Sequence, residues 1–176
     1  MQLRKAPILI SLLVTMALLF GGWFLYQKVE VEEPIRTEIS GMTSATLADL
    51  QINKDQILIK LTVTNPDKFP AEYMDLQNYI AQDITNKKVE VDLTNQNPAL
   101  KQIWMDGTFA FTEALDLREY SKIPQLVSDW KVKNHLDNAS TAMDQNNIYV
   151  FLKRGSEEYY TIVPRNTTDG EVSARG

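Results

Sequence analysis

The chain has 176 residues and no cysteine, which excludes disulfides, thiol nucleophiles and thiolate metal sites. Its 18 basic and 23 acidic residues give a net charge of −5. Setting aside Arg4 and Lys5, which precede an apolar segment, reduces the 18 basic residues to 16, so the rest of the chain carries a net charge of −7. Such a negative field disfavours nucleic acids and anionic lipid headgroups as partners.

The first predicted element is a membrane-spanning helix over residues 6–26. This segment has no charged side chain, and a helix of its length rises about 31 Å, close to the roughly 30 Å hydrocarbon core of a bilayer. Trp23 and Tyr26 lie at one end, where amphipathic rings prefer the headgroup layer. Because Arg4 and Lys5 flank the other end, the positive-inside rule places the N-terminus in the cytoplasm.

Two alternatives compete with a retained anchor. A cleaved secretory signal needs a shorter apolar region followed by small residues, whereas bulky residues stand at 23–26. A buried core helix is a poorer fit, since a soluble domain rarely needs so long an uncharged run. The anchor is therefore favoured, and the lipid bilayer is the predicted partner of residues 6–26.

The anchor implies a domain order for a single-pass membrane protein. Residues 1–5 form a cytoplasmic tip, residues 27–44 a polar stalk or extended lead-in, and residues 45–165 an extracytoplasmic domain. Residues 166–176 have little to bury and are predicted to be a disordered tail. An exported domain without cysteine is common in bacteria, which favours a bacterial cell envelope.

The first half of the domain shows clear periodicity. Alternating apolar residues predict a β-hairpin over about 45–64, with turn residues at 53–55. Pro70 suits the first turn of a helix, and apolar residues at three-to-four-residue spacing extend that helix over 70–85. Alternation at 89–93 predicts a strand with one solvated face.

The second half is predicted to be mainly helical before it ends in strands. A helix is expected from 98 to about 115, strained or broken near Gly107, and another from Pro124 to Leu136. The polar residues 137–147 are typical of a loop. A final β-hairpin is expected from Ile148 to Val163, with its turn at Arg154-Gly155-Ser156.

The predicted order is therefore β-β-α-β-α-α-β-β, which favours the α+β class. We expect an N-terminal transmembrane helix followed by a largely antiparallel sheet with two or three helices packed on one face.

Motifs for catalysis or metal binding are lacking. The one histidine, His135, stands at a predicted helix end, where the helix dipole alone favours it. Glu113, Asp116 and Glu119 recur at threes and fit a solvated helix face. The oxygen-rich residues 137–147 lack the spacing of a calcium loop. We therefore predict no catalytic residue, no metal and no cofactor.

Aromatic residues of the last hairpin supply the candidate interaction surface. Tyr149, Phe151 and Lys153 alternate with apolar residues that suit the helix-facing side of their strand. The three side chains are thus assigned to the outer face of the sheet. There they form an exposed binding surface, or they are covered by the stalk or the first hairpin.

These observations favour a non-enzymatic interaction or assembly component of a bacterial cell envelope, with another envelope protein as its partner. The alternative is a membrane-tethered sensor or binding module for a small extracellular ligand. A hydrolase is least favoured, because no convergent acid–base pair is evident.

Overall fold

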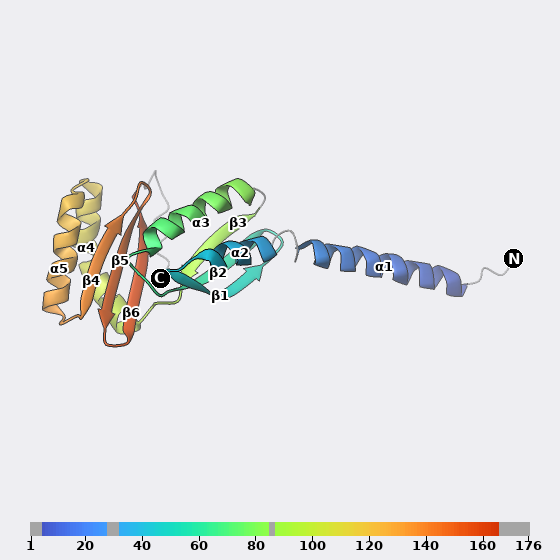
Figure 1. Cartoon of the computed structure of the whole chain (residues 1–176), viewed down its shortest axis with the longest axis horizontal. Helices are drawn as coiled ribbons and strands as arrows, with labels where there is room; N and C mark the ends of the chain where they lie inside the picture. The colour runs from blue at the N-terminus through green and yellow to red at the C-terminus, as the bar shows by residue number, and fades with distance from the viewer. Residues whose placement is uncertain (1–4, 28–31, 85–86, 166–176) are drawn as a thin grey trace. The chain divides into compact units, whose positions relative to one another are not determined.

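The computed structural model describes residues 5–27, 32–84 and 87–165, and the chain divides into two compact units, residues 1–41 and 42–176 (Figure 1). The N-terminal unit contains helices α1 (Lys5–Gln27) and α2 (Glu33–Gly41). Residues 1–4 of the predicted cytoplasmic tip and the predicted disordered tail, 166–176, lie outside the described residues.

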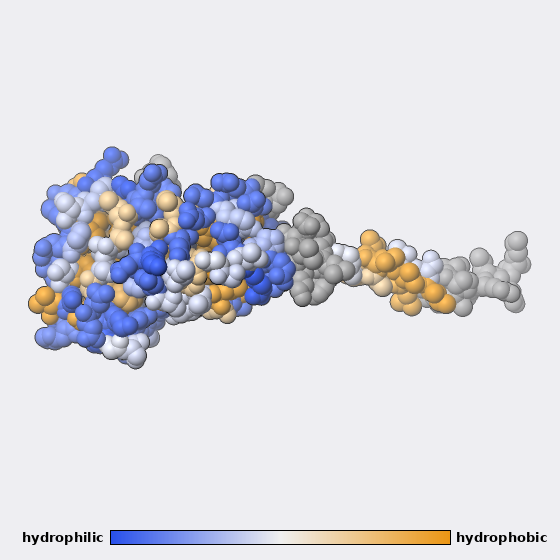
Figure 2. All heavy atoms as spheres, in the orientation of Figure 1, coloured by the Kyte–Doolittle hydropathy of each residue, from blue (hydrophilic) through white to orange (hydrophobic). Residues whose placement is uncertain are grey.

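Helix α1 coincides with the predicted membrane span. Its described side chains, those of residues 10–22, are exposed, and most are hydrophobic (Figure 2). Within the described residues, no helix is both long and apolar enough to cross a membrane. The side chains of residues 6–9 and 23–26 of the predicted span lie outside the described residues.

Helix α2 replaces the extended lead-in predicted for the stalk. Ile35 and Ile39 lie one turn apart and are both buried. The Arg36 guanidinium donates to the Glu32 carboxylate at 2.8 Å, an i,i+4 pair of the kind that supports a helix. The polar composition of the segment obscured this short apolar repeat.

The described residues of the C-terminal unit form ten elements, and their strands make two three-stranded sheets with strand orders β1-β2-β3 and β4-β5-β6. In chain order they are β1 (Ala45–Ile52), β2 (Gln56–Val63), α3 (Phe69–Asp83), β3 (Lys88–Leu93), α4 (Pro98–Asp116), the 3₁₀ turn η2 (Tyr120–Lys122), α5 (Ile123–Lys133), β4 (Asn138–Met143), β5 (Asn147–Arg154) and β6 (Glu157–Pro164). The α+β class is confirmed, whereas the single sheet with helices on one face is wrong.

The first sheet combines a hairpin with a crossover. Strands β1 and β2 pair antiparallel, as predicted for 45–64. Strand β3 then pairs parallel with β2, because α3 carries the chain back to the same end of the sheet. Alternate side chains of β2, including Ile57, Ile59 and Leu61, are fully buried, which is the pattern expected of a strand with one face in the core.

The second sheet packs against α4 and α5 on one face, and the beginning of α3 meets its other face (Figure 1) through Phe69 and Tyr73. Ile148, Val150 and Leu152 of β5 join the core of α4 and α5, as predicted. Tyr149 and Phe151 point to the opposite face. Coverage of both faces explains why β5 is buried at six consecutive positions instead of alternating.

Strand β4 overturns the predicted loop over 137–147. Its residues pair antiparallel with β5 from Asn138↔Lys153 to Met143↔Ile148. Only a tight turn remains of the loop, where the Asp144 carboxylate accepts from the backbone N–H groups of Asn146 and Asn147 at 2.7 and 2.6 Å. Small polar residues suit a half-exposed edge strand as well as a loop, so composition alone misassigned them.

Helix α4 runs unbroken through Gly107, where a break was predicted. The glycine instead permits a close approach: a Cβ there would overlap the indole ring of Trp130 on α5. Nearby Phe109 is 87% exposed.

Candidate functional site

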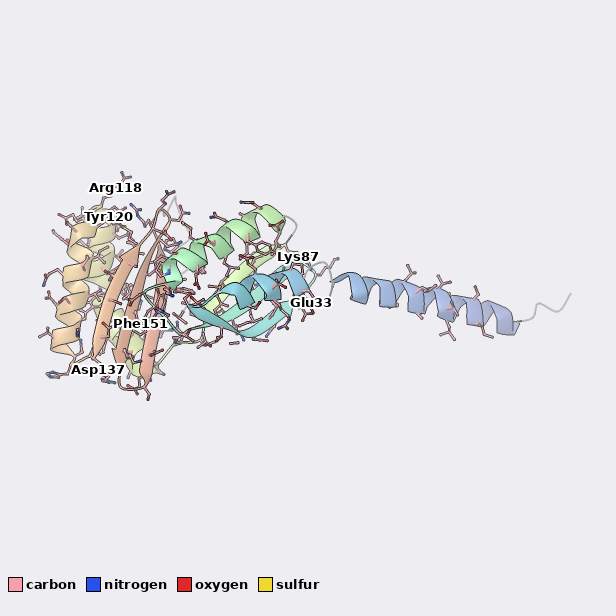
Figure 3. All side chains as sticks on the ribbon, in the orientation of Figure 1. Glu33, Lys87, Arg118, Tyr120, Asp137 and Phe151 are labelled. Carbon is pink, nitrogen blue, oxygen red and sulfur yellow. The ribbon has the colours of Figure 1, made fainter. Side chains whose placement is uncertain are left out.

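The predicted outer-face residues Tyr149, Phe151 and Lys153 do not form an exposed surface. Tyr149 is 1% exposed and Phe151 is 5% exposed, and Lys153 is ion-paired with Glu158 at 2.7 Å. Phe151 lies on β5, the middle strand of the second sheet (Figure 3). Of the two possibilities left open by the sequence, cover is the one found for Tyr149 and Phe151. Rings of α3, Phe69 and Tyr73, contact Tyr149 on this face, a neighbour that the strand pattern did not reveal.

An aromatic cluster fills the space between α3 and the second sheet. Phe69 contacts Tyr160 edge-on, with ring centroids 5.2 Å apart, and contacts Tyr149 at 6.4 Å. The hydroxyl of Tyr149 donates to the Asp144 carboxylate at 2.5 Å. Burial, and then the hydrogen bond to Asp144, raise the pKa of Tyr149. Tyr149 thus has a structural hydrogen bond and stays protonated at neutral pH.

A pocket of about 110 Å³ lies beside this cluster. Part of its wall comes from β4, part from aromatic rings of β5 and β6, and part from the loop that follows β2. The lining residues are Pro66, Asp67, Ser140, Thr141, Ala142, Tyr149, Phe151 and Tyr160. Two of the three predicted site residues therefore line a pocket, although neither is exposed.

Of the four sheet edges that the described residues of this unit form, three carry protection against pairing with another chain. Edge β1 carries a bulge between Leu47 and Asp49. Edge β3 carries the charged residues Lys88, Glu90 and Asp92. Bulges and charges are the usual means by which sheets prevent such pairing.

Edge β6 is covered by the segment that links the two sheets. The N–H of Asn97 donates to the carbonyl of Glu158 at 3.0 Å, and the N–H of Tyr160 donates to the carbonyl of Asn95 at 2.8 Å. The side chain of Gln96 also donates to the Tyr160 carbonyl at 2.8 Å. The outer side of β6 is therefore paired in its first half, from Glu158 to Tyr160.

Edge β4 has none of these protections. Its sequence, Asn-Ala-Ser-Thr-Ala-Met, contains no charged residue and no proline. Its register with β5 is regular from Asn138 to Met143. In the part of the chain that the structure describes, no element pairs with its outer side.

The pairing pattern shows which backbone groups of β4 face outward. The backbone N–H of Asp144 donates to the carbonyl of Asn147 at 3.0 Å and so closes the hairpin. Because hydrogen-bonded pairs alternate along an antiparallel ladder, Ala142 and Ser140 also bond to β5. The N–H and C=O groups of Ala139, Thr141 and Met143 then point away from the sheet, ready to pair with another strand.

The residues that could serve catalysis or metal binding do not come together in one site. His135 follows α5 with a φ of 52°, and its N–H donates to the Val132 carbonyl at 3.4 Å, so it ends the helix. Among the described residues, no group of three or more His, Asp or Glu side chains is placed to hold a metal ion.

Sequence reasoning missed the β4 edge and Asp67. A detectable signal was present: residues 138–143 form an uncharged run of strand length between two turn signals. The position of Asp67 beside Ser140 and Ala142 depends on contacts across more than seventy residues, which no local pattern encodes.

Comparisons of the chain with models of protein families, with curated proteins and with solved structures find no match.

Proposed function

We propose that this protein is a membrane-anchored, non-enzymatic interaction module that binds an extended segment of another envelope protein along β4. The observation that carries this proposal is the β4 edge, which has no charged residue and no bulge, whereas each of the other three sheet edges carries some protection. Addition of a strand to a free edge gives affinity through main-chain hydrogen bonds and specificity through adjacent side-chain pockets. The pocket lined by Ser140 and Ala142 supplies such a specificity element.

Helix α1 supports the membrane part of the proposal. Its described side chains form a hydrophobic surface, while the visible face of the C-terminal unit is largely hydrophilic (Figure 2). With Arg4 and Lys5 on the N-terminal side, the anchor would leave the acidic C-terminal unit outside the cell. This localisation follows from the sequence argument and is part of the proposal.

Pocket size argues against the alternative, a sensor for a small extracellular ligand. Ligand sites usually enclose about 300–1,000 Å³, whereas this pocket has a volume of about 110 Å³. A space of this size suits one side chain of a bound segment. Recognition of a protein segment is therefore the better-supported function.

Site-specific photo-crosslinking of the full chain in its native membrane tests the proposal. A photoreactive amino acid at Met143, on the β4 edge, should give an adduct with one partner protein, and the same probe at Asp92 on the β3 edge should not. Proline at Thr141 should abolish the adduct, because proline removes an outward N–H without breaking the β4–β5 ladder. The matched control Thr141→Val keeps the N–H and should keep the adduct.

Two results would contradict the proposal. One is an adduct that forms equally with Thr141→Pro and Thr141→Val. The other is a Met143 probe that gives no adduct although the protein is folded. Circular dichroism of each purified variant separates loss of binding from loss of folding, and Ala142→Lys provides a second variant that charges the edge without introducing proline.

A further inference from the structure

We infer that the pocket beside β4 receives one basic side chain, lysine or arginine, from the extended segment that pairs with this strand. The inference rests on the proposed function, since it concerns the chemistry of the partner at the same site.

Charge is the first argument. Asp67 is the one ionisable carboxylate among the lining residues, and no lysine, arginine or histidine lines the pocket. Asp67 is exposed, and within the described residues its carboxylate makes no hydrogen bond or ion pair. The nearby cation Lys153 is held by Glu158. The carboxylate is therefore available to a cation brought by the partner.

The aromatic walls are the second argument. Tyr149, Phe151 and Tyr160 line the pocket, and aromatic faces attract ammonium and guanidinium groups within about 6 Å. Burial, and then the charge of Asp67, raise the pKa of Tyr160. Tyr160 is therefore a neutral phenol at physiological pH, and Asp67 remains the charged group that a cation would meet.

Pocket size and register set the position of the basic residue. The pocket lies on the face of the sheet to which Ser140 and Ala142 contribute, opposite the face that packs on α5. Every second residue of a paired strand points to this face. A volume of about 110 Å³ is below that of an engineered cavity of about 150 Å³ that holds one benzene molecule, so a single side chain fills it.

A second copy of this chain is a poorer occupant. If two copies paired through their own β4 strands, the side chains offered to each pocket would come from Asn138, Ser140 or Ala142. None of these is basic, and the pairing would bring together two chains that each carry a net negative charge. Charge complementarity therefore favours a different, basic partner segment.

Binding of designed peptides to the full chain in detergent micelles tests the inference. The probes are three cyclic β-hairpin peptides, each with one strand designed to pair with β4. They differ only at one central position of that strand, which is lysine, norleucine or glutamate. We expect the lysine peptide to bind about ten-fold more tightly than the norleucine peptide and the glutamate peptide to bind most weakly. The preference for lysine should shrink as the salt concentration rises.

Asp67→Asn is the matched variant, because it removes the charge and keeps the shape. It should reduce the preference for lysine to about two-fold while leaving the norleucine peptide unaffected. If the three peptides bind equally and Thr141→Pro abolishes their binding, the inferred preference for a basic side chain is wrong, while the proposed binding along β4 is still supported. Binding of none of the peptides, or binding indifferent to Thr141→Pro, would overturn the edge proposal and this inference together. A lysine preference unchanged in Asp67→Asn would overturn the role of Asp67.

Discussion

The indole ring of Trp130 lies so close to the backbone of Gly107 that a Cβ at that position would overlap Cζ2 and Cε2 of the ring. Trp130 also packs edge-on against Trp104, with ring centroids 5.9 Å apart, and near Phe111 at 6.5 Å. The ring is enclosed by neighbours and has little room to move. Glycine therefore sets the distance between α4 and α5.

We expect Gly107→Ala to destabilise the protein by about 1–2 kcal/mol. Overpacking costs about 1–3 kcal/mol, and the better helix propensity of alanine recovers up to about 1 kcal/mol. Urea unfolding followed by tryptophan fluorescence measures the change. In a Trp130→Phe background the same substitution should cost clearly less, and an equal cost in both backgrounds would contradict the contact.

The second prediction concerns acid stability. Glu72 accepts hydrogen bonds from the backbone and hydroxyl groups of both Thr43 and Ser44, over distances from 2.5 to 2.9 Å. Burial raises the pKa of Glu72, but hydrogen bonds from Ser44 and Thr43 outweigh it and lower the pKa from 4.5 to about 2. Because the folded-state pKa is depressed, this stabilisation is present above pH 4.5 and is lost as the pH falls from 4.5 towards 2.

We therefore expect Glu72→Gln to lower the free energy of unfolding by about 1 kcal/mol at pH 7, since the carboxylate is partly solvated. The difference between the wild-type chain and the variant should vanish near pH 2. Urea titrations at several pH values measure it, and a difference that stays constant down to pH 2 would contradict the assigned pKa.

The third prediction concerns the ends of α4 and α5. Arg118 and His135 have φ values of 56° and 52°, and each is followed by a residue whose N–H bonds back into the last turn, Glu119 to Ala114 at 2.8 Å and Leu136 to Lys131 at 3.0 Å. This is the Schellman arrangement, in which glycine is the preferred residue.

Replacing His135 with glycine should therefore stabilise the protein by about 0.5–1 kcal/mol, because the left-handed backbone conformation is strained for residues with a Cβ. Asn134→Gly is the control: Asn134 has a φ of −105°, so glycine there should destabilise. Thermal unfolding of both variants checks the contrast, and a lower melting temperature for His135→Gly would refute it.

The fourth prediction concerns the link between the two sheets. The Asn95 amide accepts from the Val63 N–H at 2.7 Å and donates to the Val63 carbonyl at 3.0 Å, and it also donates to Glu158 at 2.9 Å. Asn95 is buried, so if its side chain were removed, Val63 and Glu158 would lose hydrogen bonds that water does not readily replace.

We expect Asn95→Ala to cost about 2–3 kcal/mol. The neighbouring Gln96→Ala should cost less, because Gln96 makes one such bond to Tyr160 and its Oε1 is buried without a partner among the described residues. Urea midpoints at constant m-value measure the two costs. Equal costs would show that the Asn95 hydrogen bonds are not what joins the sheets.

Local patterns in the sequence predicted most elements of the C-terminal unit. The alternation in β2 and the spacing in α3 each reflect a single buried face, which the sequence records directly. Helix α2 and strand β4 were missed, since short or half-exposed elements leave weak periodicity. Likewise, Tyr149 and Phe151 were placed on the correct face of their strand, but their burial depends on α3.

What the sequence by itself determined is the composition of each element, the apolar N-terminal segment and the lack of catalytic motifs. These follow from side-chain chemistry read over one or two turns. Only the tertiary structure decided that there are two sheets instead of one, that α3 covers the aromatic face, and that β4 is the edge left without protection. Those outcomes arise from contacts between residues far apart in the chain, such as Phe69 with Tyr160, where competition for burial and not local propensity selects the arrangement.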